Sequence, residues 1–289
     1  MRVISLLPSA TEIICSVGGE AYLVGVTHEC DYPAGINDLP VVTESIVPKG
    51  MASKDIDQLV SDHLTGTNAL YSLDESMVQA LKPDLIVSQS LCEVCAVAAN
   101  EIEHVALDLD PVPQVINLEP SSLGDVFQTM RQVGNAIGHT DAARETVDKL
   151  QARVDAVKQA SNQIATTHKQ SVAVLEWLDP LFSSGHWTPE LVQLAGGVEA
   201  TGNIFQPSTR LSWEALHHAD PDIIVIALCG FDVDRSRLDL ALVEPRLEWR
   251  SLRAVRNNNI HVVDGNAYFS RPGPRLVDSL ELVADILRR

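Results

Sequence analysis

The chain has 289 residues, which is enough for one large domain or for two lobes of ordinary size, and we expect two lobes. Its formal net charge is −18, from 39 Asp and Glu against 21 Lys and Arg. This balance argues against nucleic acid as a partner, because phosphate binding needs clustered basic residues. No run of 18 apolar residues occurs, so we expect no insertion into a membrane.

The N-terminus and the cysteines bear on where the protein works. Met1 and Arg2 lead directly into a predicted strand, without the basic segment, apolar stretch and cleavage site of a secretory signal. Five cysteines, an odd number in a chain of this size, fit reduced thiols or ligands better than a disulfide framework. On the sequence alone we expect a cytoplasmic protein.

The first predicted unit consists of a strand over 3–7, a loop, and a helix that ends at Gly18 and Gly19. A second strand over 22–27 leads into the segment His-Glu-Cys-Asp-Tyr-Pro at 28–33. We expect this segment to be a polar loop, and it is unusually dense in side chains that can bind ligands.

The rest of the first half alternates between short apolar and amphipathic segments. Residues 41–51 contain turn residues and no period, so no element is predicted there. We expect helices over 53–64 and 73–81, strands over 85–87, 105–107 and 114–117, and a helix from Ser121 or Ser122 to about Ile137.

A long helix is predicted over 140–165. Apolar residues recur there at the spacing of one helical face, no Gly or Pro interrupts the segment, and Thr140 stands where an N-cap would. With a rise of about 1.5 Å per residue, such a helix would span roughly 39 Å. We expect it to form a rigid connection between the lobes.

The chain after this helix repeats the pattern of the chain before it. A strand over 172–175, a loop, a helix and the stop at Gly196 and Gly197 match the opening unit, and the Pro-Asp turn and apolar strand of 219–226 match 81–87. The sequence therefore predicts an α/β fold with two Rossmann-like lobes joined by a single long backbone helix. The expected bounds are 1–139 for the N-terminal lobe, 140–165 for the helix and 166–289 for the C-terminal lobe.

Side chains suited to ligand binding follow several of the predicted strands. In open parallel sheets, ligands bind beyond the carboxyl ends of the strands. Loop tryptophans can form a flat ligand surface or belong to the core, and His186 can contact a ligand or make a structural hydrogen bond. The predicted ligand-binding residues are His28, Glu29, Tyr32, Trp177, His186, Trp187, Phe269 and Arg271.

Three cysteines of the first lobe form a candidate metal site. Cys30 and the pair Cys92 and Cys95 follow different strands, and thiolates completed by His28 or Glu93 suit zinc, iron clusters or cobalt. Two alternatives stay open: the sulfurs pack as small apolar groups, or the pair is a thioredoxin-like redox motif, although the aromatic and proline neighbours of such motifs are absent. Cys15 and Cys229 lie within apolar runs, and we expect both in the core.

Nothing in the sequence predicts catalysis. The chain has no G-x-G-x-x-G, no P-loop and no G-x-S-x-G elbow, so nucleotide enzymes and α/β-hydrolases lack their usual motifs. We see no paired acids that would serve an enzyme with a carboxylate base, and we expect a protein that binds without chemistry.

Several segments together resemble the substrate-binding proteins of ABC importers for cobalamin and iron chelates. They are the opening Val-Ile-Ser-Leu-Leu-Pro-Ser-Ala-Thr-Glu at 3–12, the strand 23–26 with Asp-Tyr-Pro at 31–33, Leu-Lys-Pro-Asp-Leu-Ile-Val at 81–87, and Gly196-Gly197 with Asn-Ile-Phe at 203–205. The match covers nearly the whole chain and is closest to the cobalamin-binding branch. It implies the helical-backbone class, in which a corrinoid or another metal chelate lies flat between the lobes against aromatic side chains.

The resemblance also implies an ABC permease as partner and a periplasmic or cell-surface location. In this family an acidic residue on each lobe docks to arginines of the permease. Glu214 matches the acid of the second lobe, whereas the position in the first lobe falls at Ser76, beside Asp74 and Glu75, and we assign the role to Glu75.

The chain departs from the transport branch in three ways. It lacks an export signal, it inserts a segment between Met51 and Leu73, and it adds the loops that contain Cys30 and the Cys92/Cys95 pair. The alternative function is therefore a cytoplasmic metal-binding or thiol redox protein that uses these three cysteines on the same scaffold.

Overall fold

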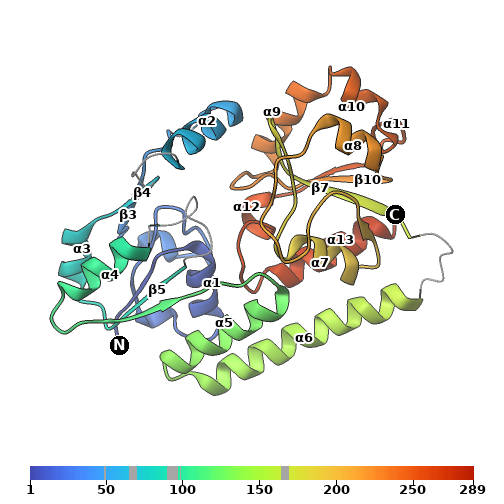
Figure 1. The fold of residues 1–289 in the computed structure, drawn as a ribbon. Coiled ribbons are helices and arrows are strands. Elements are labelled where there is room, and N and C mark those ends of the chain that lie inside the picture. The colour runs from blue at the N-terminus through green and yellow to red at the C-terminus, as the bar shows by residue number, and fades with distance from the viewer. Residues whose placement is uncertain (49, 65–69, 90–96, 98, 164–168) are drawn as a thin grey trace. The chain divides into compact units, whose positions relative to one another are not determined.

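The structure is a computed structural model that describes all residues except 49, 65–69, 90–96, 98 and 164–168 (Figure 1). The chain forms two compact units. Unit 1 comprises Met1–Pro120 and Gly124–Asp148, and unit 2 comprises Ser121–Leu123 and Lys149–Arg289. The division falls inside helix α6 (Thr140–Gln163), so the two units share this helix.

Unit 1 is built on a parallel sheet with the strand order β2-β1-β5-β6. The strands are β1 (Val3–Ser5), β2 (Leu23–Gly25), β5 (Leu85–Ser88) and β6 (Gln114–Asn117). Every residue of β1 and β5 is buried, as a central parallel strand with both faces covered requires. The core contains Ile4, Ile86 and Val78, the last from α3 (Glu75–Leu81).

The remaining helices of unit 1 are α1 (Pro8–Ser16), α2 (Ser53–Leu64), α4 (Ala99–Leu107) and α5 (Leu123–Ala136), with short 3₁₀ helices η1 (Glu20–Tyr22) and η2 (Ile36–Asp38). The prediction of a strand over 105–107 is wrong, because these residues end α4. Ile102, Val105 and Ala106 are buried on one face of that helix, while Leu107 is 70% exposed. A short apolar run does not distinguish a strand from a helix end.

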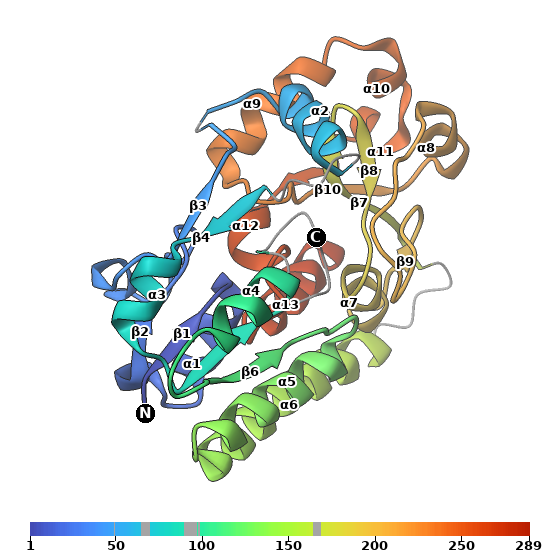
Figure 2. The ribbon, with the colours of Figure 1, turned by 60° about the vertical axis from the view of Figure 1, so that its left-hand side comes forward.

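A small antiparallel sheet in unit 1 was missed by the sequence analysis. It pairs β3 (Thr43–Ser45) with β4 (Tyr71–Leu73), and the two strands lie side by side in both ribbon views (Figures 1 and 2). The predicted helix over 73–81 begins later, at Glu75, because Leu73 belongs to β4 and the Asp74 carboxylate caps the helix by accepting from the N–H of Met77 at 2.9 Å.

Unit 2 is built on a five-stranded sheet with the order β11-β10-β7-β8 and with β9 paired to β7. The strands are β7 (Ser171–Leu178), β8 (Leu181–Ser183), β9 (Val198–Glu199), β10 (Ile223–Ile226) and β11 (Ile260–Val262), and only the β7–β8 pair is antiparallel. Its helices are α7 (Thr188–Leu194), α8 (Trp213–Ala219), α9 (Val233–Val243), α10 (Leu247–Ser251), α11 (Arg253–Arg256), α12 (Gly265–Tyr268) and α13 (Leu276–Leu287).

The predicted repeat between the two halves extends to hydrogen bonds. Helices α3 and α8 both end in a residue with positive φ that is followed by Pro-Asp and a buried strand. Asp84 accepts a hydrogen bond from the N–H of Arg2 at 2.7 Å, and Asp222 accepts one from the N–H of Ser171 at 2.9 Å. In each unit, this aspartate therefore links the start of one strand to the Pro-Asp turn that precedes the neighbouring strand.

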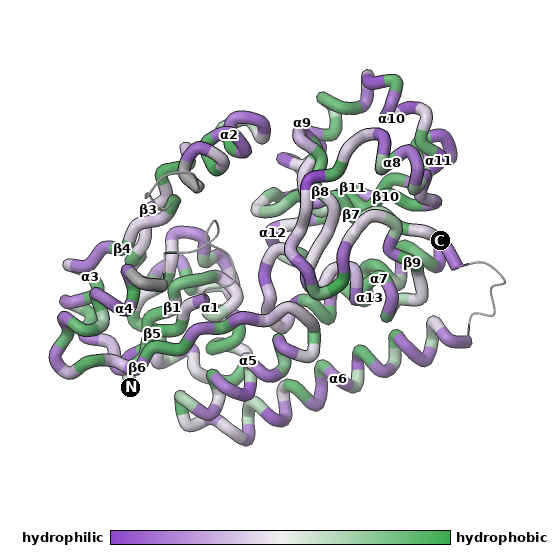
Figure 3. Tube along the Cα trace, in the orientation of Figure 1, coloured by the Kyte–Doolittle hydropathy of each residue, from purple (hydrophilic) through white to green (hydrophobic). Residues whose placement is uncertain are grey.

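Helix α6 buries one apolar face, made of Ala143, Val147, Leu150, Val154 and Val157. Hydrophobic and hydrophilic residues alternate along it in Figure 3. Thr140 is its first helical residue rather than its N-cap, because the N–H of Ala143 donates to the carbonyl of His139. The chain thus has the predicted α/β fold with two lobes joined by one long helix. None of the helices in the described part of the chain is both long and apolar enough to cross a membrane.

Candidate functional site

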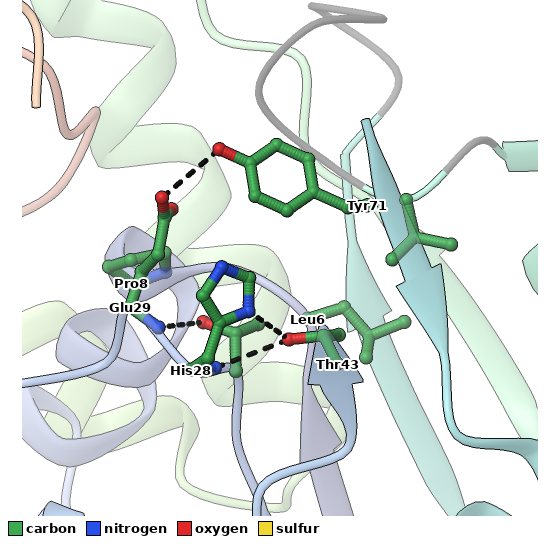
Figure 4. Close-up of a pocket in the computed structure, with 8 residues that line it drawn as sticks. Leu6, Pro8, His28, Glu29, Thr43 and Tyr71 are labelled. Carbon is green, nitrogen blue, oxygen red and sulfur yellow. Dashed lines mark hydrogen bonds between the residues drawn. The ribbon is translucent and has the colours of Figure 1, made fainter. Parts of the chain in front are cut away.

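A shallow hollow that encloses only about 10 Å³ opens on unit 1 (Figure 4). Its lining comes from the loops after β1 and β2 and from the small β3–β4 sheet. The lining residues are Leu6, Pro8, Thr27, His28, Glu29, Thr43, Tyr71 and Val97. The strands β1 and β2 are parallel neighbours, so their carboxyl ends meet at one edge of the sheet, which is where sequence reasoning expected ligand-binding residues.

Local hydrogen bonds hold the loop after β2 against β3. The chain pairs Val26 with Val41, and the backbone N–H of His28 donates to Oγ1 of Thr43 at 3.2 Å. The Nδ1 atom of His28 lies 2.8 Å from the same hydroxyl oxygen. Because Thr43 is buried, this contact anchors an exposed imidazole to a rigid part of the unit.

An aromatic ring and a carboxylate complete the polar side of the hollow. The ring of Tyr71 stacks on that of His28 with a centroid distance of 5.3 Å and an interplanar angle of 30°. The Tyr71 hydroxyl donates to Oε1 of Glu29 at 3.1 Å, as the dashed line in Figure 4 shows. Leu6, Pro8 and Val97 add apolar surface. The site therefore combines an imidazole, a carboxylate and an apolar floor, which suits a ligand with both apolar and polar or metal-bearing parts.

Sequence reasoning found part of this site and missed the rest. His28 and Glu29 are among the predicted ligand-binding residues and line the hollow, whereas Tyr32 is 47% exposed and does not line it. Thr43 and Tyr71 were missed, because they lie on three-residue strands in segments without a hydrophobic period. Their position depends on pairing across residues that are far apart in the chain, which no local pattern reveals.

The structure describes one of the three cysteines of the predicted metal site. Cys30 is buried, and its sulfur lies 3.1 Å from the hydroxyl oxygens of both Thr11 and Thr27. Cys92 and Cys95 lie outside the described residues. Among the residues that are described, no group of three or more His, Cys, Asp and Glu side chains is arranged to hold a metal ion.

The two cysteines expected in the core differ from each other. Cys15 is only half-buried, and it is not among the buried residues of the core. Burial nevertheless raises the pKa of its thiol to about 12, with smaller contributions from nearby negative charge, so the thiol stays protonated. The prediction for Cys229 is wrong, because its side chain is exposed just beyond β10. Burial along the apolar run ends at Leu228, one residue before Cys229.

In unit 2, three of the predicted ligand-binding residues form one cluster. The indole N–H of Trp187 donates to the carbonyl of Phe269 at 2.9 Å, and the His186 ring stacks on Trp187 at 5.4 Å. Trp187 is 6% exposed and Phe269 is 3% exposed. Burial also lowers the pKa of His186. A role for these residues in binding stays a prediction; Trp187 and Phe269 are enclosed in this structure, and His186 is half-buried.

The other two predicted residues of unit 2 lie apart from that cluster. Trp177 is part of strand β7 and not of a loop, so its prediction as a loop residue is wrong, and its ring contacts Phe231 at 5.1 Å. Arg271 is buried and donates to Oδ1 of Asn266 at 3.1 Å.

Two buried carboxyl groups in unit 2 escaped the sequence analysis. Glu176 on β7 accepts hydrogen bonds from the N–H of Gly185 at 3.2 Å and from the Ser208 hydroxyl. Oε1 of Glu199 accepts from the N–H groups of Thr201 and Gly202. Burial raises the pKa of each glutamate to about 7, and the charge of Glu199 contributes to the rise at Glu176. The sequence signal that could have found Glu176 is its place as a single Glu inside the apolar run of 172–178.

The predicted docking acids Glu75 and Glu214 are both exposed and lie in the first turns of α3 and α8. When α3 and α8 are aligned at their C-terminal ends, Ser76, and not Glu75, falls at the position of Glu214. An exposed acid at a helix N-terminus is electrostatically favourable by itself, so the placement alone assigns no role.

Comparison with known proteins decides the family. Residues 3–267 match the family described as periplasmic binding protein. The chain belongs to this family. This periplasmic binding protein is 22% identical over 292 residues to YvrC of Bacillus subtilis, an uncharacterized ABC transporter substrate-binding lipoprotein, covering 98% of this chain and 79% of the relative. It is 24% identical over 281 residues to a vitamin B12-binding protein of Pectobacterium atrosepticum, covering 96% and 84%.

A solved structure gives the same fold. The periplasmic heme-binding protein RhuT from Roseiflexus superposes with a TM-score of 0.73 at 21% identity, over 99% of this chain and 97% of that protein. The predicted resemblance to substrate-binding proteins of ABC importers and the predicted fold are therefore confirmed.

Proposed function

We propose that this periplasmic binding protein holds a corrinoid or a closely related metal chelate for an ABC-type system. The observation that carries the proposal is the hollow of unit 1, in which His28, Glu29 and Tyr71 surround an apolar floor beyond the carboxyl ends of β1 and β2. The name of the Pectobacterium relative supports the ligand class, and the name of the Bacillus relative supports the transport system.

The size of the hollow limits what unit 1 contributes. Pockets that enclose a whole small-molecule ligand measure roughly 300 to 1,000 Å³. The hollow of unit 1 encloses only about 10 Å³, roughly the room of one water molecule, so unit 1 alone contacts a small part of a large ligand. A planar chelate with projecting polar groups fits this limit, because it can lie against the residues of the hollow while most of its surface stays outside.

Charge favours a corrinoid over a heme. Unit 1 contains 22 Asp and Glu against six Lys and Arg, and Glu29 places a carboxylate in the hollow itself. Heme carries two free carboxylates, which this field repels, whereas the amide side chains of a corrinoid are uncharged and its cobalt centre is cationic. The solved heme-binding relative makes heme the natural competitor to test.

The experiment is purification from cells supplied with cobalamin, followed by visible absorption and analysis for cobalt, iron and zinc. The expected result is a corrinoid spectrum with cobalt, or an empty protein that binds aquacobalamin saturably on titration and binds hemin less tightly. Stoichiometric zinc without corrinoid would instead support the metal-binding or thiol redox alternative at Cys30, Cys92 and Cys95. Absence of binding to either chelate would overturn the proposal.

We further propose that Glu75 and Glu214 dock to the permease of that system. Both are exposed, and neither is needed for the hydrogen bonds that cap its helix, which come from Asp74 and Ser212. Charge reversal at both positions should abolish transport in cells while leaving ligand affinity unchanged. Equal transport by the Glu75→Lys/Glu214→Lys variant and the unaltered protein would remove these acids from the interface.

The side of the membrane on which the protein works separates uptake from intracellular handling. The family and its lipoprotein member support uptake from outside the cytoplasmic membrane. Fractionation of the native host, with protease treatment of intact cells, tests the location. Protection from protease together with corrinoid binding would favour intracellular handling of the same ligand.

A further inference from the structure

The imidazole of His28 is presented in a way that suits coordination of a metal. Its Nδ1 atom lies 2.8 Å from Oγ1 of the buried Thr43, and its ring stacks on Tyr71. The side chain is exposed, and within the described part of the chain Nε2 has no hydrogen-bond partner. One nitrogen is therefore anchored and the other is open to the hollow.

This arrangement matches the way proteins orient a histidine ligand. A ligating imidazole commonly donates its second ring N–H to a fixed acceptor, which sets the tautomer and the ring orientation. The Thr43 hydroxyl can accept from Nδ1–H, which leaves the lone pair on Nε2. Stacking on Tyr71 restricts rotation of the ring as well, so little conformational freedom remains to be lost when Nε2 binds.

The number of nearby donors indicates what kind of metal centre fits. The described residues hold no group of three or more His, Cys, Asp and Glu side chains placed around one point. A bare divalent ion requires several protein ligands, commonly three or four for zinc. A metal whose equatorial positions are filled by its own macrocycle requires only one axial ligand, which a single imidazole supplies.

Glu29 adds a favourable charge to the same place. Its carboxylate is fixed by the Tyr71 hydroxyl at 3.1 Å, next to the ring that stacks on His28. A cationic metal centre that approaches Nε2 therefore meets a negative charge that is already oriented. The buried sulfur of Cys30 offers no comparable access, because hydroxyl groups of Thr11 and Thr27 contact it.

We propose that Nε2 of His28 is the axial ligand to the metal of the bound chelate, with Thr43 as the residue that positions the ring. This inference rests on the proposed function. It adds that unit 1 contributes a coordinate bond and not only surface contact.

The test uses cobinamide, a corrinoid that lacks the nucleotide base, so that any nitrogen bound axially to cobalt must come from the protein. Binding is measured first by equilibrium dialysis. The reduced Co(II) form is then examined by electron paramagnetic resonance, in which one axial nitrogen splits each cobalt line into three. The unaltered protein should show this threefold splitting. The His28→Ala variant should lose it and bind at least tenfold more weakly.

Two further variants separate coordination from general damage to the site. Tyr71→Phe keeps the stacked ring and removes the bond to Glu29, so the splitting should persist. Thr43→Val removes the anchor of Nδ1 and should weaken binding less than His28→Ala does, with the splitting retained in the protein that still binds.

The outcomes distinguish the two proposals. Failure of the unaltered protein to bind aquacobalamin, hemin and cobinamide overturns the proposed function and this inference together, whereas binding of aquacobalamin without binding of cobinamide overturns this inference alone. Tight binding without nitrogen splitting, or splitting that survives in His28→Ala, overturns the axial role of His28 alone and leaves the proposed function intact. Circular dichroism of each variant confirms folding, which the exposure of His28 makes the expected result.

Discussion

At the scale of single residues, the buried carboxyl groups of unit 2 should make stability depend on pH. The pKa of Glu199 is raised from 4.5 to about 7 in the folded protein, so the folded state holds this proton more tightly than the unfolded state does. The stabilisation is fully present below the unfolded pKa and is lost as pH rises through the folded one. Linkage makes the loss on the order of 3 kcal/mol for one carboxyl, and less for a pair that shares protons.

The variant Glu199→Gln keeps an oxygen acceptor for Thr201 and Gly202 and removes the ionisation. Its free energy of unfolding should therefore fall less between pH 5 and pH 8 than that of the unaltered protein, as measured by urea titration at each pH. Glu248→Gln, at an exposed position on α10, is the matched control and should leave the pH dependence unchanged. An identical pH dependence in the Glu199→Gln protein would show that this carboxyl ionises normally.

Trp187 should contribute to the stability of unit 2 whatever its role in binding. The side chain is 6% exposed, and its N–H is bonded to the carbonyl of Phe269. Replacement by Ala removes a large buried ring and leaves that carbonyl without its donor, which should cost roughly 3 to 5 kcal/mol of unfolding free energy. Phe205→Ala is the control, because Phe205 is 45% exposed and its loss should cost far less. Equal costs would mean that Trp187 is not a core residue.

At the scale of elements, close packing joins α5 to α6. A Cβ atom at Gly134 would lie 2.3 Å from Cβ of Ala143, closer than two such atoms can approach. Gly134→Ala should therefore destabilise the protein by about 1 to 3 kcal/mol, even though Ala favours helices. Adding Ala143→Gly removes the obstructing atom. A double-mutant cycle measured by chemical unfolding should give a favourable coupling between the two changes, and strict additivity would contradict the predicted contact.

The elements that could be predicted from the sequence are those whose pattern is local. Helix α6 shows a complete apolar face, and the Pro-Asp turns before β5 and β10 show both the helix end and the strand that follows. The β3–β4 sheet could not be predicted, because each strand has three residues and its stability comes from the partner. The apolar run of 172–175 predicts a strand that ends before Trp177, whereas pairing with β8 extends β7 to Leu178.

The same distinction applies to the candidate site. His28 and Glu29 could be found because they follow a strand directly in the chain. Thr43 and Tyr71 reach the hollow only through pairing of β3 with β4 and through the contact of Val26 with Val41, so their role depends on tertiary structure. The buried carboxyl of Glu199 depends likewise on how the chain after β9 folds around it.

At the scale of the whole molecule, the negative charge is divided unequally. Unit 1 carries 22 acidic and six basic residues, a formal charge of −16, whereas unit 2 carries 17 and 15, a formal charge of −2. Repulsion between like charges destabilises a compact state, and salt screens it over distances of about 10 Å at 0.1 M. Raising the salt concentration should therefore stabilise unit 1 more than unit 2.

All four tryptophans lie in unit 2, so indole fluorescence reports the unfolding of that unit alone. Hydrogen exchange measured by mass spectrometry reports the local stability of both units. Between 0.05 and 0.5 M sodium chloride, amide exchange in peptides of unit 1 should slow more than in peptides of unit 2. Potassium glutamate serves as a control for effects specific to chloride. Equal slowing in both units would mean that the surplus of acids in unit 1 does not govern its stability.

The most direct test of the central claim is hydrogen exchange of the purified protein with and without aquacobalamin at saturating concentration. The proposed site predicts slower exchange in the peptides that contain residues 26–30, 43–45 and 70–73, which carry the polar side of the hollow. Peptides of α13 serve as the internal reference. Saturable binding that leaves those three segments unchanged would place the ligand elsewhere and contradict the assignment of the hollow as the binding site.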